Sequence, residues 1–454
     1  MPLTTDDRRF TAATCVLLAV AVTAVAWGVV PWGTFQFDDL RNVVRDPATT
    51  DAVVLLERLP DGLRPLTRLS YFLDAQLYGL NAAGFLATNL FLHAVTVLLV
   101  YVVARRRLGQ TGALIAALLF SAQPANAEVV AYVSGRSTGL MTPPLLAGLL
   151  FHDKGKHIAA LALFALACLA KEHALVFPAL VLAWEITRAE RKPAAARHAV
   201  LHFAAAGLIL AALLSIERYR LLLTNALMDR SFFESLLANA RAIPEMLSLW
   251  VRPWALSADH GFDERLNAGA SIVGLLILVA ALGTAIALRR RQPMVALAIA
   301  WALISLLPTN SILAKADLVT EKPLYLAWVG PSIALGAGIS SLLRVTSSLV
   351  AKRVLVSATA VVVLALIGAS AWRASLWRDP VALWTDAVAK APYKSRCWNN
   401  LGMANLAAER HAEALVAFQR AVFLDPRNEY AAMNLLTARV LCGSECVAVA
   451  TVSD

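Results

Sequence analysis

Residues 85–107 read FLATNLFLHAVTVLLVYVVARRR, a run of twenty mostly apolar residues followed by three arginines. About 20 consecutive apolar residues are what an α-helix needs to cross the hydrocarbon core of a bilayer. Lys and Arg collect in the loops that face the cytoplasm. The stretch therefore predicts a membrane-spanning helix whose C-terminal end, at Arg105-Arg106-Arg107, lies on the cytoplasmic side.

Similar apolar stretches recur along the chain and determine the predicted fold class. Of the 454 residues, 59% are hydrophobic, whereas soluble domains contain about 45–50% apolar residues. We therefore expect an all-α, polytopic membrane protein with about eleven transmembrane helices. The expected spans are approximately residues 11–30, 85–104, 110–123, 137–151, 157–170, 174–187, 198–216, 270–288, 294–313, 323–343 and 354–372.

Residues 238–256 form a further apolar segment, but two prolines and two charged residues interrupt it: Pro244, Pro253, Glu245 and Arg252. Non-helical backbone at membrane depth is tolerated only where it is buried in protein or lines a cavity. We expect an interfacial or re-entrant helix here rather than a full crossing.

The basic residues also predict the orientation of the chain. They cluster in alternate loops, whereas the loops 31–84 and 217–269 mix acids with bases and are expected to face outward. The net charge of +10 then reflects topology and gives no reason to expect a nucleic-acid partner. We expect a bacterial inner-membrane protein whose N-terminus is cytoplasmic, whose first span is not cleaved and whose C-terminal tail is periplasmic.

After the expected membrane domain (1–373), the tail (374–454) has the amphipathic pattern of a soluble helical domain. Residues 395–428 match the 34-residue tetratricopeptide pattern, at Trp398, Leu401, Gly402, Ala414, Phe418, Ala421 and Pro426. So few repeats rarely fold alone, so the tail is expected to pack on the membrane domain or on a partner. Cys442 and Cys446 are spaced to allow a disulfide; no zinc site is expected, because no pair of histidines accompanies them.

The first outward loop, 31–84, carries the strongest candidate for chemistry. Asp38 and Asp39 follow the first expected span directly. Adjacent carboxylates are costly at the end of a membrane helix unless they have a function. A carboxylate there could take a proton from a hydroxyl group. Both are catalytic candidates, with Asp38 favoured because it is closer to the helix.

Other polar residues fall at the same, outward ends of the spans. Cations there would suit a phosphate, and the candidates for binding the substrate or its phosphate are Arg64, Arg136, Lys171, Lys322 and Tyr325. The supporting candidates are Asn89, His93, Glu128, Glu172 and Glu321. Two alternatives stay open: Asn89 and His93 share a helix face and could serve only interhelical hydrogen bonding, and Lys171 could simply pair with Glu172. No nucleotide-binding or hydrolase motif occurs.

In this order, the motifs resemble a known family. Asp38-Asp39, Arg64-Pro65-Leu66-Thr67, the 88–93 segment, Glu128 with Ser134-Gly135-Arg136, Lys171-Glu172 and the closing repeat are similar to the transmembrane-and-tetratricopeptide-repeat O-mannosyltransferases and their bacterial relatives, in the GT-C superfamily of polytopic glycosyltransferases. The resemblance implies a polyprenyl-phosphate-linked sugar donor and an inverting transfer on the outer face. It also implies a catalytic acid in the first outer loop, at Asp38 or Asp39.

The sequence departs from the family at one site motif. Where relatives carry Glu-Arg-Tyr, this chain has Glu321, Lys322, Pro323 and then Tyr325; Lys keeps the charge but loses the bidentate geometry of Arg.

The expected function is transfer of a sugar, with mannose one candidate, from a polyprenyl-phosphate donor to a hydroxyl of an envelope or secreted protein. The alternatives are a lipid or polysaccharide acceptor, and a non-catalytic membrane scaffold that docks partners through its repeat. No cofactor is required, although a divalent metal is compatible with the chemistry.

Overall fold

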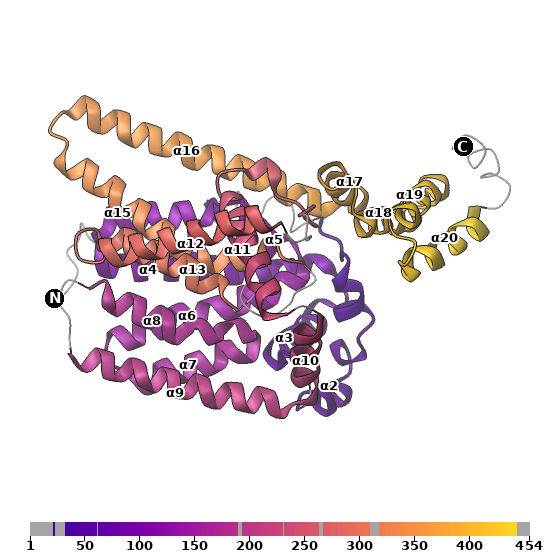
Figure 1. Ribbon diagram of the computed structural model, residues 1–454, viewed down its shortest axis with the longest axis horizontal. Coiled ribbons are helices and arrows are strands. Elements are labelled where there is room, and N and C mark those ends of the chain that lie inside the picture. The colour runs from indigo at the N-terminus through magenta and orange to yellow at the C-terminus, as the bar shows by residue number, and fades with distance from the viewer. Residues whose placement is uncertain are drawn as a thin grey trace.

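The computed structural model describes residues 21–22, 32–60, 62–188, 193–229, 231–262, 267–308 and 317–442. Every regular element in these ranges is helical, which confirms the all-α prediction. The longer helices lie side by side in a bundle, and the C-terminal helices project from one end of it (Figure 1). The α-helices are α2 (Ala52–Arg58), α3 (Pro65–Tyr78), α4 (Ala82–Ser121), α5 (Ala127–Ala131), α6 (Arg136–Asp153), α7 (His157–Ala170), α8 (Phe177–Ile186), α9 (Pro193–Ser215), α10 (Glu217–Asp229), α11 (Phe232–Ser248), α12 (Ala268–Leu288), α13 (Pro293–Leu306), α14 (Lys322–Ala327), α15 (Val329–Val345), α16 (Leu349–Ser375), α17 (Pro380–Lys390), α18 (Ser395–Ala407), α19 (His411–Leu424) and α20 (Glu429–Cys442).

Five helical segments in the described residues are long and apolar enough to cross a membrane, so the chain is a multi-pass membrane protein. They are Ala82–Ser121, His198–Ser215, Ala268–Leu288, Lys322–Val345 and Leu349–Arg378. Two shorter apolar helices, α7 and α13, accompany them. The expected first span lies almost entirely outside the described residues, so the number of eleven crossings stays a prediction.

Close helix packing explains how the bundle holds together. Helix α4 combines two of the expected spans, with a break at Gly109, whose φ is 73°; glycine adopts this left-handed backbone without a steric penalty. Just beyond, a Cβ on Gly336 of α15 would lie 2.3 Å from the carbonyl oxygen of Gly112. Small residues let membrane helices approach this closely and gain van der Waals contact.

The tail forms a row of antiparallel helices, and α20 begins at residue 429, where the next 34-residue unit after 395 would start. Gly402 is needed where α18 meets α19, because a Cβ would lie 2.5 Å from the Phe418 ring. The assignment of this tail to the tetratricopeptide class stays a prediction. Cys442 is disulfide-bonded; Cys446 lies outside the described residues.

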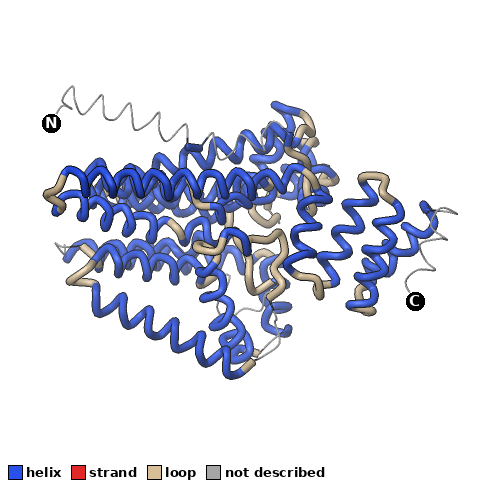
Figure 2. The backbone as a smooth tube through the Cα atoms, turned by 90° about the horizontal axis from the view of Figure 1, so that it is seen from above, coloured by secondary structure: helices blue, strands red, loops and turns tan. Residues whose placement is uncertain are grey.

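The tail packs against the membrane domain through charged side chains. Arg396 donates to both carboxylate oxygens of Asp259 at 2.6 Å and to Asp317 at 2.5 Å. Lys394 also donates to Asp259, at 2.6 Å. Figure 2 shows the loops that separate the bundle from the tail helices. The tail is therefore attached at a defined place, at the same end of the bundle as Asp38 and Asp39.

Candidate functional site

The turn at residues 36–39 fixes the second carboxylate. Asp39 is fully buried. Its Oδ2 accepts from the Gln36 N–H at 3.0 Å, and its Oδ1 accepts from the Ser134 N–H and hydroxyl at 2.7 and 2.6 Å. Phe37, which lies between Gln36 and Asp38 in this turn, has a φ of +39°. Non-glycine residues rarely adopt this backbone conformation, and it clusters at functional sites. Burial raises the pKa of Asp39 from 3.8 to about 7, although these hydrogen bonds oppose the rise.

The first carboxylate of the pair is more accessible. Asp38 is half-buried, and its backbone N–H donates to the Tyr132 hydroxyl at 3.0 Å. Within the described ranges of the chain, no hydrogen bond or ion pair engages the Asp38 carboxylate. Asp39 is thus held by the protein, whereas Asp38 is left to meet an incoming group.

A cation lies over the ring of Tyr132. Lys322 Nζ is 4.5 Å from the centre of the Tyr132 ring and 3.4 Å from Glu128 Oε1. Its side chain is 25% exposed, so the ammonium can still contact a ligand. Burial raises the pKa of Glu128, and the charge of Lys322 partly offsets the rise.

The segment 128–136, between α4 and α6, packs against side chains from several parts of the site. Asn89 of α4 donates to the carbonyl oxygens of Val129 and Tyr132 at 3.3 and 2.8 Å. The Tyr71 hydroxyl donates to the Val133 carbonyl oxygen at 3.3 Å. A Cβ on Gly135 would lie 2.7 Å from the Glu128 carbonyl oxygen. The segment is therefore a tightly packed floor beneath Asp38.

Arg136 begins α6 and has no exposed side-chain surface. Its guanidinium donates to Asp74 Oδ2 at 2.6 Å, to the Phe85 carbonyl oxygen at 2.7 Å, to Ser70 at 3.3 Å and to Asn89 Oδ1. A buried charge that is paired and hydrogen-bonded in this way holds its surroundings in place. The structure places Arg136 under the site, turned away from solvent.

A second cation is more accessible. Arg64 makes a bidentate ion pair with Glu172, with bonds of 2.9 and 2.5 Å, and the two side chains are 40% and 37% exposed. Burial alone would raise the pKa of Glu172, but Arg64 outweighs it and lowers that pKa to about 2. Lys171 is buried and donates to Thr138 Oγ1 at 2.7 Å. The ion pair of Glu172 thus joins the short segment after α7 to Arg64 in the loop before α3.

Two other predicted residues lie deeper. His93 Nδ1 is 2.8 Å from the Tyr325 hydroxyl, which joins α4 to α14, and both side chains are buried. Together with the bonds of Asn89, this is the interhelical hydrogen bonding that was the open alternative for the Asn89–His93 pair.

Glu321 links the site to the tail. Its Oε1 accepts from the Ser257 N–H at 2.6 Å and lies 3.1 Å from His260 Nε2. Arg373 at the end of α16 is fully buried, 3.5 Å from Glu321 and 3.6 Å from Asp386 of α17. A small cavity of about 30 Å³ lies here, lined in part by Glu128, His260, Glu321 and Arg396.

Sequence reasoning missed three side chains of this site: Tyr132, Arg373 and Trp377. Trp377 stacks on Tyr132 with ring centres 4.9 Å apart. Arg373 could have been found, because an arginine at the end of an expected span is costly without a partner. Tyr132 gives no such signal, because an aromatic residue at a membrane interface is ordinary.

Two known proteins that are similar to this chain are named O-mannosyl-transferases. It is 28% identical over 169 residues to a protein O-mannosyl-transferase of Caenorhabditis elegans, a match that covers 32% of this chain and 24% of the worm protein. It is 30% identical over 140 residues to protein O-mannosyl-transferase TMTC3 of Mus musculus, covering 29% of this chain and 15% of the mouse protein. These names confirm the resemblance predicted from the ordered motifs. The matched segments span a quarter or less of each relative.

No family model matches the sequence. A crystal structure of the Archaeoglobus fulgidus oligosaccharyltransferase with a tethered acceptor peptide is 11% identical, with a TM-score of 0.45 over 89% of this chain and 58% of that one. A similarity of this size is too low to define a shared fold.

Proposed function

We propose that this chain is a membrane glycosyltransferase that moves a sugar from a polyprenyl-phosphate donor to a hydroxyl group of a protein. One observation carries the proposal: an accessible, unpaired carboxylate, Asp38, and an accessible cation, Lys322, flank the same tyrosine, Tyr132. A transfer of this kind needs both a base for the acceptor and a positive charge for the leaving phosphate.

The proposed reaction is a single displacement. The Asp38 carboxylate takes the proton of the acceptor hydroxyl, and the hydroxyl oxygen attacks the anomeric carbon. The bond between that carbon and the phosphate oxygen breaks, and the lipid phosphate leaves with the electron pair. The anomeric configuration is inverted. Lys322 stabilises the charge that develops on the phosphate.

The burial of the cations supports different roles for them. Lys322 and Arg64 keep exposed surface, 25% and 40% of the side chain, so we assign donor-phosphate binding to these two. Arg136 and Lys171 are buried and already donate to protein oxygens. We assign them to positioning the floor at residues 128–136. Asp39 likewise positions the turn that presents Asp38.

The tail suits a role in holding the acceptor. A groove of about 460 Å³ runs between α17, α18 and α19, lined by Val381, Trp398, Leu401 and Val416 among others. The Phe37 ring, next to Asp38, lies 5.6 Å from the Trp384 ring of α17. A polypeptide bound along the tail would therefore begin close to the proposed base. The outer face of a bacterial inner membrane is the proposed location.

The test is transfer of label by the purified chain in lipid vesicles. The vesicles receive polyprenyl-phosphate mannose, radiolabelled in the sugar, and an envelope-protein extract from which small molecules have been removed. We expect label in the protein fraction, lost with Asp38→Asn. Label only in the lipid or polysaccharide fraction would replace the protein acceptor with the alternative one. No transfer to any fraction, with this donor or with other polyprenyl-phosphate sugars, would favour the scaffold.

A further inference from the structure

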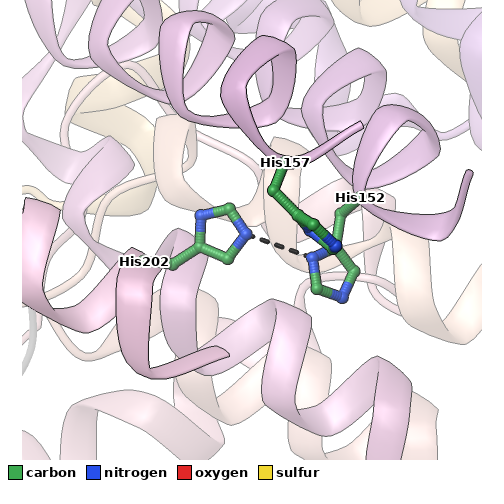
Figure 3. A group of neighbouring side chains, drawn as sticks. All are labelled: His152, His157 and His202. Atoms are coloured by element: carbon green, nitrogen blue, oxygen red, sulfur yellow. Dashed lines mark hydrogen bonds between the residues drawn. The ribbon is translucent and has the colours of Figure 1, made fainter. Parts of the chain in front are cut away.

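Four of the chain's eight histidines gather at the end of the bundle opposite to Asp38. His152 lies in the last turn of α6, and His157 begins α7. His198 and His202 are four residues apart on α9, so they lie on the same face of that helix. In Figure 3, His202 reaches from one ribbon toward His152 and His157. Three helices therefore contribute imidazole rings to one place.

The nitrogen atoms of three of these rings are spaced as metal ligands are. One ring nitrogen from each of His152, His157 and His202 lies within 4.8 Å of the others. His152 Nδ1 and His202 Nε2 are 3.1 Å apart. With zinc–nitrogen bonds of about 2.0–2.1 Å, ligand nitrogens in a tetrahedral site are separated by about 3.3 Å. Small rotations of the rings would bring all three nitrogens to that separation.

A carboxylate stands behind the first of these ligands. Nε2 of His152, the nitrogen that faces away from His202, lies 3.5 Å from Glu185 Oε1. Metal-ligating histidines usually donate their second N–H to a carboxylate or carbonyl oxygen, which fixes the tautomer. Arg188 contacts Glu185 at 3.2 Å and also pairs with Asp153. The positive charge of Arg188 is therefore balanced by these two carboxylates.

The hydrogen bonding of the cluster is incomplete as it stands. Nδ1 of His157 and Nδ1 of His202 are buried without a hydrogen-bond partner among the described residues. Buried polar atoms left unpaired each cost about 1–3 kcal/mol. The His198 ring stacks on His157 with centres 3.6 Å apart. One hydrogen bond joins His152 to His202, and it does not satisfy the two unpaired nitrogens. A cation would accept lone pairs from ring nitrogens that now face one another, as His152 Nδ1 and His202 Nε2 do.

We propose that His152, His157 and His202 bind a divalent metal ion of the zinc class, which fastens α9 to the hairpin of α6 and α7. His198 or a water molecule would complete the coordination. Imidazole ligands favour zinc, cobalt and nickel over magnesium or calcium. Only 11% of the membrane-spanning window of α9 is buried against the rest of the chain, so an ion held by His202 would add a contact between this helix and the α6–α7 hairpin.

The metal would be structural. His152 is 16 residues from Arg136 along α6, which corresponds to about 24 Å at 1.5 Å per residue. An ion at this distance cannot contact the sugar or the phosphate. Its loss should loosen α9 and leave the proposed reaction intact.

Metal binding by the full chain tests the proposal. The protein is purified in detergent with an affinity tag that contains no histidine, treated with EDTA, and titrated with Co²⁺ and, separately, with Zn²⁺. We expect about one ion per chain, with the intense visible absorption of tetrahedral Co²⁺. His157→Gln and His202→Gln should each weaken binding at least tenfold. Glu185→Gln, which keeps the side-chain shape, should weaken it about tenfold.

The matched control is His411→Gln, because His411 begins α19 in the tail, away from the cluster; it should bind as the wild type does. The wild-type titration needs no variant to fold. Less than a tenth of an ion per wild-type chain, or equal binding by the wild type and both cluster variants, would overturn the proposal.

Discussion

At one end of α6, Arg136 is surrounded by oxygen atoms that accept its hydrogen bonds. At the other end, His152 faces other imidazole rings and a single carboxylate. Around Arg136 opposite charges combine and the protein satisfies the guanidinium, although Glu321 Oε2 and the Arg373 guanidinium, at the same end of the bundle, have no hydrogen-bond partner among the described residues. The other end combines like groups and leaves buried nitrogens unpaired. Two clusters at the ends of one helix thus differ in which polar atoms the chain itself satisfies, and an unpaired buried atom marks a place where a ligand could bind.

The largest expected effect is at the first end, in the proposed base. Asp38→Asn should lower the rate of sugar transfer by about 10²–10⁴-fold, because the amide cannot accept the proton. The metal content of the chain should not change. The rate is measured in vesicles with labelled donor, and the metal by mass spectrometry.

Asp51→Asn is the matched control for this variant. Asp51 caps α2 in the same outward loop, and asparagine caps helices about as well as aspartate. Equal rates for Asp38→Asn and the wild type would remove Asp38 from the mechanism and break the contrast between the two ends.

The next effect concerns the stability of the segment 128–136, the floor of the site. Gly135→Ala should destabilise the folded chain by about 1–3 kcal/mol, because its Cβ would meet backbone atoms at 2.7 and 2.8 Å. Gly139→Ala, in the first turn of α6 just after Gly135, is the control, since the nearest atom would be 3.5 Å from its Cβ. Thermal unfolding in detergent compares the two. If both variants unfold alike, the floor is not as rigid as the packing indicates.

Substitution of Lys322 tests whether this side chain binds the phosphate of the donor. Lys322→Ala should raise the KM for the donor by about tenfold, the size expected for one lost hydrogen bond to a charged group. Lys322→Arg should keep most of the affinity. Lys352→Ala, near the start of α16 at the far end of the bundle, serves as the control. A KM that does not depend on Lys322 would transfer this role to Arg64.

The smallest effect concerns pH. The pKa of Asp39 rises from 3.8 to about 7 on folding because the carboxyl group is buried, so the folded chain binds this proton more tightly than the unfolded chain. The resulting stability is fully present below about pH 4 and is lost as the pH rises through 7. The melting temperature should fall by a few degrees between pH 5 and pH 8. Asp39→Asn should flatten that slope; identical slopes would mean that Asp39 does not titrate here.

Much of the fold could be predicted from the sequence, because apolar length and basic clusters report directly on membrane helices. The candidate site was harder to predict. Asp38 and Asp39 stand out as neighbouring charges, but the sequence does not reveal that Asp39 is buried and bonded to Ser134 and Gln36 while Asp38 stays accessible. The histidine cluster could not be predicted: its members come from three helices, and only tertiary packing brings them together.

The most direct test of the central claim is the structure of the Asp38→Asn protein bound to a polyprenyl-phosphate sugar and an acceptor peptide, determined by electron cryomicroscopy. The substituted side chain should trap both substrates before transfer. We predict an acceptor hydroxyl within about 2.6–3.2 Å of the side-chain amide at position 38, and the donor phosphate beside Lys322. A donor phosphate bound elsewhere, or an acceptor hydroxyl turned away from position 38, would contradict the account.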